Sequence, residues 1–400
     1  MANVSSSNGI EKRPKLQFRD ADGHLFPAWK QYRFDSLYKP VSEKNDLSYG
    51  VEHIISVANM YFKPDARISD LEYLRTYNVF KYGDIAFEGN KSKNYANGRF
   101  VENTIGDGIV SHVFNVLRPI SPKHNLEYWK YAINNENVMG RILARCTKKT
   151  TMMTNLVTAD FLEQEICCPI ELEQDKIAFF LSLIEKRLAA QEQLVDALKK
   201  YKRGLLQAIF SREVHLENST CWERRLFSEI ASLNKGKYSP KQDEVLPCIE
   251  LEHLEQQTGQ IIGYANSNEQ NSVKSVFHKG DVLFGKLRPY LRKFALPEYD
   301  GVCSSEIWVF HPEHDINSTF LFYLIQSESF IAAANISSGT KMPRAEWSKV
   351  SNESFFIPEL SEQKRIADLF GSIDKRIVNA SRSANEMQSL KQGLLQQLFI

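Results

Sequence analysis

The sequence predicts a mixed α+β protein in which two pseudo-symmetric α/β domains are separated by two long helices that form an antiparallel intramolecular coiled coil. Three observations carry this prediction. The chain repeats itself, each repeat ends in a long heptad pattern, and each repeat opens with short strand-like runs beside helical ones. A length of 400 residues is enough for two or three domains with cores of their own.

The internal repeat is the strongest signal. Residues 166–210 align with residues 355–399 without a gap at an offset of 189, and 14 of these 45 positions are identical. Average composition would match about one position in sixteen, or about three of them. The similarity extends upstream, where VFKYGDIAF at 79–87 corresponds to VFHKGDVLF at 276–284. The whole chain therefore has the pattern of a duplication.

Both copies of the repeat carry apolar residues at alternating spacings of four and three, which is the heptad seam of a coiled coil. About 33 residues at 1.5 Å each predict helices about 50 Å long. An apolar stripe needs a partner, and the chain carries a matching one, so we expect the two helices to pair. Lys202 and Lys391 interrupt the seam and can set its register. A homodimeric coil or a plain core helix is the alternative. The predicted seam residues are Ile177, Leu181, Ile184, Leu188, Val195, Leu198, Leu205, Ile209, Ile366, Phe370, Ile373, Ile377, Met387, Leu394 and Leu398.

These patterns divide the chain into five parts. We expect an N-terminal tail at 1–26, a first α/β domain at 27–165, a central repeated long helix at 166–212, a second α/β domain at 213–354 and a C-terminal repeated long helix at 355–400.

Composition limits the function classes. The 50 basic and 49 acidic side chains give a net charge of +1, so any basic surface must be local. The first residues fit neither a secretory signal nor a membrane span. Six cysteines without a C-x-x-C pair and nine histidines without an H-x3-H pair indicate neither a zinc site nor a disulfide framework. We therefore expect a protein with reduced thiols in the cytoplasm, with no metal and no membrane partner.

Basic loops follow the shared Gly-Asp dipeptide in both halves and are the candidate binding sites. Arginine and asparagine can read base edges in the major groove, while lysine holds phosphates. A basic loop can also be an ordinary solvated turn, but these loops recur at matching places. A third loop, SGTKMPR, precedes the second long helix, and the first half has ARCTKKTTMM instead. The candidate DNA-binding residues are Asn90, Lys91, Lys93, Asn94, Tyr95, Arg99, Lys148, Lys149, Lys286, Arg288, Tyr290, Arg292, Lys293, Lys341 and Arg344.

No catalytic motif was found. The chain contains no G-x4-G-K-[ST] phosphate loop and no N-P-P-Y tetrapeptide, and its lone G-x-G lacks a third glycine. Asp84, Glu88 and Lys91 could imitate a nuclease metal site. The second half has Gly285 in place of Glu88, however, so we interpret this trio as a chance arrangement.

Two long helices that open with P-x3-E-Q-x2-I-A and close with K-x-G-L-L-Q-x2-F, together with RPKLQF at 13–18, resemble the specificity subunits of type I restriction-modification systems. The resemblance covers nearly the whole chain. It implies two target recognition domains that each read half of a split double-stranded DNA sequence, with the helices as spacer and as docking site for modification subunits. It further implies a non-catalytic chain without cofactors, in a complex whose modification and restriction subunits use S-adenosylmethionine, ATP and Mg for DNA methylation and cleavage.

Two alternatives stay open at this level. The chain could be a structural adapter whose coil joins two protein-binding modules, which would show no salt-dependent affinity for duplex DNA. It could also be an enzyme with an unrecognised site, which would show turnover on its own.

Overall fold

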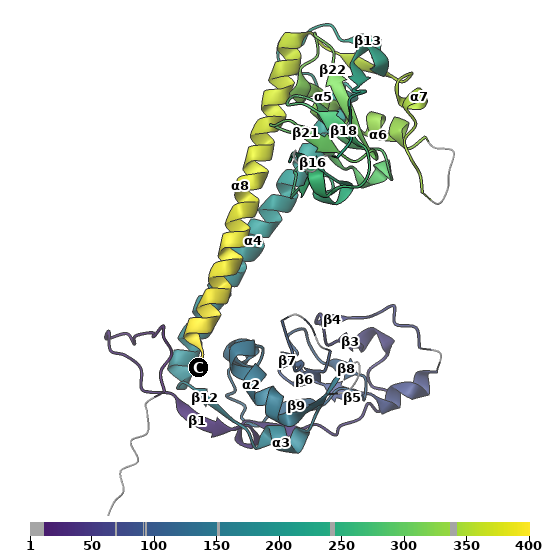
Figure 1. Ribbon diagram of the computed structural model, residues 1–400. Coiled ribbons are helices and arrows are strands. Elements are labelled where there is room, and N and C mark those ends of the chain that lie inside the picture. The colour runs from purple at the N-terminus through teal and green to yellow at the C-terminus, as the bar shows by residue number, and fades with distance from the viewer. Residues whose placement is uncertain are drawn as a thin grey trace, which may run out of the picture. The chain divides into compact units, whose positions relative to one another are not determined.

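The computed structural model describes residues 12–68, 70–90, 92, 94–149, 153–240, 245–336 and 342–400. The chain forms two compact units. Unit 1 consists of the residues up to Ala190 together with Ser383–Ile400, and unit 2 consists of Gln191–Arg382. Two long helices, α4 (Glu171–Phe210) and α8 (Leu360–Leu398), each contribute one half to either unit (Figure 1).

Unit 1 is built around a four-stranded antiparallel sheet in the order β2-β9-β6-β7. Its inward side chains are large and apolar, and Phe34, Phe100 and Phe161 are fully buried. The sheet strands are β2 (Tyr38–Pro40), β6 (Ile85–Glu88), β7 (Arg99–Glu102) and β9 (Val116–Pro119). Paired strands outside this sheet are β1 (Lys30–Arg33) with β12 (Glu165–Cys168), β3 (Ile55–Ser56) with β4 (Tyr61–Phe62), β5 (Asn78–Phe80) with β8 (Gly108–Val110) and β10 (Thr147–Lys149) with β11 (Thr154–Leu156). The short helices are α1 (Leu126–Ala132), α2 (Glu136–Cys146) and α3 (Thr158–Leu162), with 3-10 turns at Phe34–Ser36, Val51–His53 and Leu71–Thr76.

Unit 2 repeats this plan. Its four-stranded sheet has the order β14-β22-β19-β20, which is the order of the unit 1 sheet strand for strand. The strands are β14 (Ala231–Leu233), β19 (Val282–Gly285), β20 (Phe294–Ala295) and β22 (Ile307–Pro312). A five-stranded sheet joins β15 (Lys237–Tyr238), β18 (Lys274–Phe277), β21 (Gly301–Cys303), β16 (Pro247–Ile249) and β17 (Ala265–Asn266), and β13 (Glu223–Leu226) pairs with β23 (Ser354–Ile357). The helices are α5 (Ser318–Leu324), α6 (Glu328–Ala334) and α7 (Trp347–Val350), with 3-10 turns at Phe227–Glu229, Leu251–His253, Ser267–Glu269 and Pro289–Leu291.

The two long helices run antiparallel wherever they touch within a unit. In unit 1 Glu185 contacts Lys391, and in unit 2 Gln191 donates a hydrogen bond to the carbonyl of Ala380 while Lys202 contacts Asp374. Each predicted seam residue is buried or half-buried, as the heptad assignment requires. The helices have 40 and 39 residues, so at 1.5 Å per residue they are about 60 Å long rather than about 50 Å.

Each repeated segment, 166–212 and 355–400, contains a strand before its long helix. Each begins with an edge of β structure, β12 in unit 1 and β23 in unit 2. Pro169 and Pro358 separate strand from helix, since proline restricts the residue before it to extended conformations. The limits of the five parts remain a prediction.

A repeated glutamine closes the start of each long helix. Gln174 Nε2 donates to the carbonyl oxygen of Pro169 at 2.9 Å, and Gln363 Nε2 donates to that of Pro358 at 3.0 Å. Both glutamines are buried. A buried carbonyl without a donor would be costly, so this contact explains why the P-x4-Q spacing occurs twice.

The seam lysine of α8 makes a three-part contact in unit 1. Lys391 Nζ lies 2.6 Å from Glu185 Oε1, and the hydroxyl of Tyr131 donates to Glu185 Oε2 at 2.7 Å. Burial by itself raises the pKa of the Glu185 carboxyl, but these two partners outweigh it and hold that pKa below its usual value. The contact joins α8, α4 and α1.

The equivalent residues of unit 2 make the same contact. Lys202 Nζ lies 2.7 Å from Asp374 Oδ1, and the Tyr323 hydroxyl donates to Asp374 Oδ2 at 2.8 Å. Burial lowers the pKa of the Lys202 amine, while the charge of Asp374 opposes the shift. Each seam lysine therefore fixes the register of the helix pair and ties it to the globular part of the same unit.

Residues 12–26 differ from the frayed tail that was predicted for residues 1–26, whose first 11 members lie outside the described residues. The Leu16 amide donates to the carbonyl of Gln397 at 3.0 Å, and the ring of Phe18 lies 5.6 Å from that of Phe180. The apolar C-terminus is covered in the same region, where Phe399 packs against Trp29. Leu16 and Phe18 therefore pack against the unit 1 parts of both long helices. No helix in the described part of the chain has the length and apolarity that a bilayer span requires.

Candidate nucleic-acid interface

Two of the predicted loops lie side by side in unit 2. The Arg288 amide donates to the carbonyl of Pro343 at 2.8 Å, and the Ala345 amide donates to that of Lys286 at 2.8 Å. Leu287 and Arg344 form an antiparallel bridge between these two hydrogen bonds. The loop after β19 and the loop before α7, 58 positions apart at Lys286 and Arg344, therefore form one continuous surface.

A strained turn presents the centre of this surface. Arg288 and Arg292 both have φ of 53°, in the left-handed region that arginine rarely adopts, and they flank the 3-10 turn Pro289–Leu291. Such strain persists only where the surroundings impose it, and it concentrates at binding sites. Its result here is that the Arg288 side chain and the ring of Tyr290 project from the protein, with Tyr290 51% exposed. Arg288 has no side-chain hydrogen bond or ion pair with another described residue.

The other predicted cations of unit 2 have partners within the protein. Arg292 forms an ion pair with Glu328, Lys293 Nζ donates to the carbonyl of Leu251, and Arg344 places its fork on Glu306 with two contacts of 3.1 Å. Lys286 is half-buried with its amine unpaired among the described residues, and Lys341 lies outside them. Arg288 is therefore the predicted arginine that remains available to a ligand.

Unit 1 brings the equivalent segments together. The amide and hydroxyl of Thr154 donate to the carbonyl of Gly89 at 2.8 and 2.9 Å, and Asn90 forms a bridge with Met153. The loop after β6 thus lies against the β10–β11 hairpin, as the loop after β19 lies against the segment before α7. This hairpin carries Lys148 and Lys149, both exposed. The first half therefore has a counterpart of the SGTKMPR turn, in the form of a hairpin.

The remaining candidates of unit 1 divide in the same way. Arg99 is engaged internally, since its Nε lies 2.7 Å from Glu88 and its Nη2 donates to the carbonyl of Ala58. The guanidinium also covers the half-buried ring of Tyr95, 5.0 Å from its centroid. Asn90 and Asn94 are exposed, whereas Lys91 and Lys93 lie outside the described residues.

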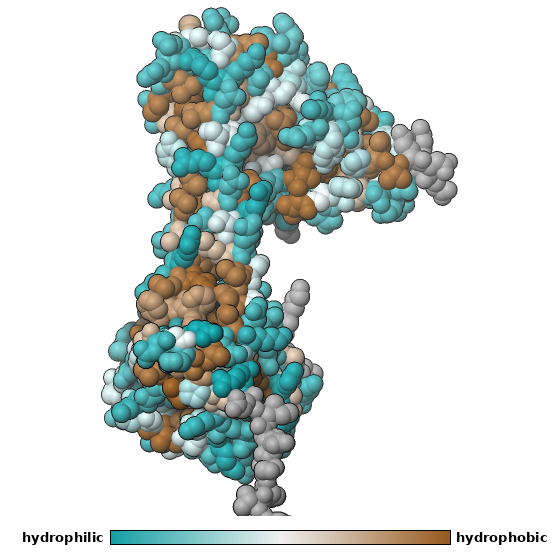
Figure 2. Space-filling view, turned by 90° about the vertical axis from the view of Figure 1, so that its left-hand side faces the viewer, coloured by the Kyte–Doolittle hydropathy of each residue, from teal (hydrophilic) through white to brown (hydrophobic). Residues whose placement is uncertain are grey.

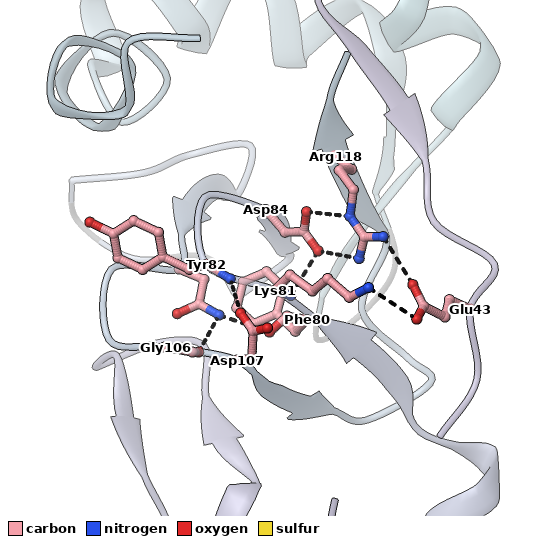
Figure 3. Close-up of polar contacts among 9 residues, drawn as sticks. Glu43, Phe80, Lys81, Tyr82, Asp84, Gly106, Asp107 and Arg118 are labelled. Atoms are coloured by element: carbon pink, nitrogen blue, oxygen red, sulfur yellow. Dashed lines mark hydrogen bonds and ion pairs between the residues drawn. The ribbon is translucent and has the colours of Figure 1, made fainter. Parts of the chain in front are cut away.

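The shared Gly-Asp dipeptide shapes the turn that precedes each of these loops. Asp84 Oδ2 accepts the amide of Lys81 at 2.8 Å, and Gly83 adopts a φ of 85° that favours glycine (Figure 3). In the same turn the Tyr82 amide donates to Asp107 Oδ1 at 2.8 Å. The guanidinium of Arg118 reaches Asp84 with two contacts of 2.8 Å.

Unit 2 has the same turn with a different side chain against the carboxylate. Asp281 accepts the amide of His278 at 2.8 Å, and His311 Nδ1 lies 2.8 Å from Asp281 Oδ1 in place of the guanidinium. In both units the carboxylate is almost fully buried. Burial raises the pKa of the Asp84 carboxyl even though Arg118 acts against it. Asp84 and Asp281 thus have a structural role. Of the three residues that could imitate a nuclease site, Asp84 is paired with Arg118 and Glu88 with Arg99. Lys91 lies outside the described residues.

One further group of possible metal ligands occurs among the described residues. Asp20, Asp22 and His24 bring their ligand atoms within 4.8 Å of one another. Asp20 Oδ1, however, already accepts the amides of Asp22 and His24, so the carboxylate closes a turn.

Sequence reasoning missed a buried acid. Glu102 in β7 is 6% exposed, and its Oε2 has no hydrogen-bond partner among the described residues. Burial, reinforced by the charge of Glu127, raises the pKa of the Glu102 carboxyl to about 8. The only sequence signal was a charged residue at an inward position of an alternating strand.

Comparisons with known proteins agree with this architecture. A family model described as type I restriction modification DNA specificity domain matches residues 221–387. The EcoDI specificity subunit of a type I restriction enzyme from Escherichia coli is 24% identical over 332 residues, which cover 71% of this chain and 71% of that protein. The MjaVIII specificity subunit from Methanocaldococcus jannaschii is 24% identical over 262 residues, which cover 58% of this chain and 60% of that protein.

Two solved structures share the fold. The S subunit of a type I restriction-modification system from M. genitalium aligns over 97% of this chain and 99% of its own, with 16% identity and a TM-score of 0.54. A chain from a study of complex assembly and conformational transition of the type I R-M system aligns over 93% of this chain and 97% of its own, with 16% identity and a TM-score of 0.58.

Proposed function

We propose that this chain is a DNA specificity subunit of a type I restriction-modification system and that each unit reads one half of a bipartite duplex DNA sequence, a proposal that the family match to residues 221–387 and the similarity to the EcoDI specificity subunit support. The single observation that best supports the proposal is the recurrence of one arrangement in both units. In unit 1 the loop after β6 is hydrogen-bonded to the segment before α3, and in unit 2 the loop after β19 is hydrogen-bonded to the segment before α7. Exposed cations lie on both of these surfaces.

The chemistry of this surface fits duplex DNA. Arg288 offers a fork of donors that matches the O6 and N7 acceptors of guanine, while Lys148, Lys149 and Lys286 can neutralise phosphates. Tyr290 adds an exposed ring with a hydroxyl that can reach the backbone or a base edge. The loops are positioned by the cations that have partners within the protein, which are Arg99, Arg292, Lys293 and Arg344.

Catalysis belongs to other chains in this proposal. The specificity subunit binds no cofactor, the modification subunits dock on its helices and use S-adenosylmethionine, and the restriction subunits use ATP and Mg. The assembled complex then works on DNA in the cytoplasm.

Replacing Arg288 with alanine is expected to relax or abolish recognition of one position in the second half-site only. A good bidentate contact contributes about 1–3 kcal/mol of discrimination, which corresponds to roughly 5- to 150-fold between matched and mismatched sites. The measurement is methylome mapping in cells that express the variant together with its modification subunit. Arg224→Ala, at an exposed position of β13 outside the loops and the long helices, is the matched control and should leave the target unchanged. Equal loss at both half-sites would instead indicate a folding defect.

Deleting one heptad from both long helices, residues 188–194 and 377–383, should change the number of unspecified bases between the half-sites. The two deletions lie at the same level of the pair, since the contact between Gln191 and Ala380 is at the centre of both. Methylome sequencing gives the spacing directly. An active complex that retains the original spacing would show that the helices are not a spacer.

A further inference from the structure

A buried glutamine of unit 2 lies between the turn at residues 288–292 and the helix pair. The face of unit 2 that Figure 2 shows mixes hydrophilic and hydrophobic residues, whereas Gln326, just after α5, lies beneath the surface and is 5% exposed. Its Oε1 accepts a hydrogen bond from Lys202 Nζ at 3.2 Å, and its Nε2 donates to the carbonyl oxygen of Phe322 at 2.9 Å. Its own carbonyl oxygen accepts Arg292 Nη1 at 3.4 Å. The turn, α5 and α4 therefore meet at one residue, and all of these groups belong to unit 2.

The side chain of Arg292 fixes the turn at two points. Its Nη2 forms an ion pair with Glu328 in the first turn of α6, and its Nη1 is held by Gln326. The backbone is in the left-handed region with φ of 53°, and its amide donates to the carbonyl of Pro289 at 2.9 Å. An arginine keeps such a backbone only where its surroundings impose it. The two contacts of the guanidinium provide that constraint.

Unit 1 has a glycine at the position of this arginine. The strands β7 and β20 occupy the same place in their sheets, and their registers match Phe100 with Phe294. Gly98 therefore stands where unit 2 has Arg292, and its φ of 76° is also left-handed. Glycine adopts this conformation without the steric cost that other residues meet. The backbone of the turn thus needs no arginine, and Arg292 is explained by what its side chain contacts.

Unit 1 also differs on the helix side of this contact. Aligning α1 with α5 at their asparagine N-caps places Asn134 where unit 2 has Gln326. The side chain of Asn134 is one methylene shorter, and its Oδ1 is buried without a hydrogen-bond partner among the described residues. The loop of unit 1 reaches α2 through its main chain instead, where the backbone of Ala96 is hydrogen-bonded to the carboxyl of Glu136. Unit 1 therefore lacks both members of the connection.

We propose that Gln326 is a positioning residue for DNA reading by unit 2, because it connects, through Arg292, the turn that carries Arg288 and Tyr290 to Lys202 in the helix pair. This inference rests on the proposed function and deepens it. Arg292 then orients Arg288 from behind and does not itself contact DNA. A displaced turn would still attract phosphates, but it would lose base discrimination, because a bidentate contact requires a defined geometry.

The test gives unit 2 the residues of unit 1, with Arg292→Gly and Gln326→Asn made singly and together in the full chain. Glycine fits a φ of 53°, so Arg292→Gly should fold like the wild type and keep its urea midpoint. Glu328→Gln, at a side chain that is 51% exposed, weakens the hold on Arg292 without touching the core. The measurement is the affinity of the chain, assembled with its modification subunit, for duplexes with single mismatches in either half-site at several salt concentrations.

Arg292→Gly should reduce discrimination in the second half-site by about fivefold or more and leave the first half-site unchanged. Glu328→Gln should act in the same direction, and the double variant should lose no more than Arg292→Gly alone, since both changes break one connection. The dependence of affinity on salt should not change, because no phosphate contact is removed. A salt slope reduced by about one contact would show that Arg292 binds DNA itself and would overturn the proposal. Additive losses from Arg292→Gly and Gln326→Asn, or unchanged discrimination in Arg292→Gly and Glu328→Gln, would also overturn it.

Hydrogen exchange of the free protein separates this inference from the function on which it rests. In Arg292→Gly and Gln326→Asn the amides of Arg288 and Leu291, which are hydrogen-bonded in the wild type, should exchange about fivefold faster or more, with no change in the loop of unit 1. Unchanged exchange, with normal half-site discrimination by the wild type, would refute this inference alone. A wild type without half-site discrimination would refute the proposed function itself, whatever the exchange rates.

Discussion

Replacing Arg118 with alanine is expected to lower the free energy of unfolding of unit 1 by about 3 kcal/mol, because removing one partner of a buried ion pair leaves the other charge uncompensated. Asp84 is 1% exposed and receives two contacts from this guanidinium. Urea denaturation followed by hydrogen exchange would assign the loss to amides of the β6–β9 sheet.

Unit 2 supplies the matched control for this change. His311→Ala removes the residue that faces Asp281, but the imidazole side chain is 65% exposed, so water can replace it at little cost. We expect a loss below about 1 kcal/mol there. Losses of equal size in the two units would mean that burial of the side chain that faces the aspartate does not decide the effect.

Glu102→Gln is expected to stabilise unit 1 in a strongly pH-dependent way. Burial raises the pKa of this carboxyl from 4.5 to about 8 in the folded state, so the folded chain holds a proton that the unfolded chain releases between these values. Stability contributed by the protonated carboxyl is therefore complete below pH 4.5 and declines as pH rises toward 8. Glutamine cannot ionise, and it should avoid a loss of up to about 5 kcal/mol.

Comparing the variant with the wild type at pH 4 and pH 9 isolates this effect. The two should differ little at pH 4, and the variant should unfold at higher urea concentration at pH 9. Unit 2 serves as an internal reference, because the registers Phe87 to Phe100 and Phe284 to Phe294 place Leu296 where unit 1 has Glu102. An advantage of the same size at both pH values would show that the pKa of Glu102 is not raised in the folded state.

The helices could be predicted closely because their signal is local. Heptad spacing at Ile177, Leu181 and Ile184 depends only on the geometry of one helix, and duplication supplied a second reading of each position. The antiparallel direction followed from pairing two equal helices in one chain. The start of each helix follows from Pro169 and Pro358, which lie just upstream of the first helical residues, Glu171 and Leu360.

The loops were harder, because the state of a cation depends on residues distant in sequence. Arg288 and Arg292 look alike in sequence, four positions apart in one basic run. Arg292 meets Glu328, 36 positions away, whereas Arg288 is held outward by a left-handed backbone. Composition indicated a basic loop correctly but could not distinguish the arginine that supports the loop from the one available to a ligand.

The acidic partners of the seam lysines were equally hidden. Lys202 and Lys391 were identified as polar seam positions, but Glu185 and Asp374 stand off the seam pattern and gave no signal of their own. Tyr131 and Tyr323 complete these contacts from short helices whose packing the heptad does not describe. Long-range pairing of this kind requires the tertiary structure.

The paired lysine contacts limit how such a chain can evolve in length. Glu185 meets Lys391 in unit 1, and in unit 2 Asp374 meets Lys202 and Gln191 contacts Ala380. After an insertion between these contacts in only one helix, one lysine could still reach its carboxylate, and the other would be separated from its carboxylate. Lineages in which the long helices become longer or shorter must therefore change α4 and α8 by the same amount. A new target spacing would then arise by matched duplication or loss of whole helical turns in both.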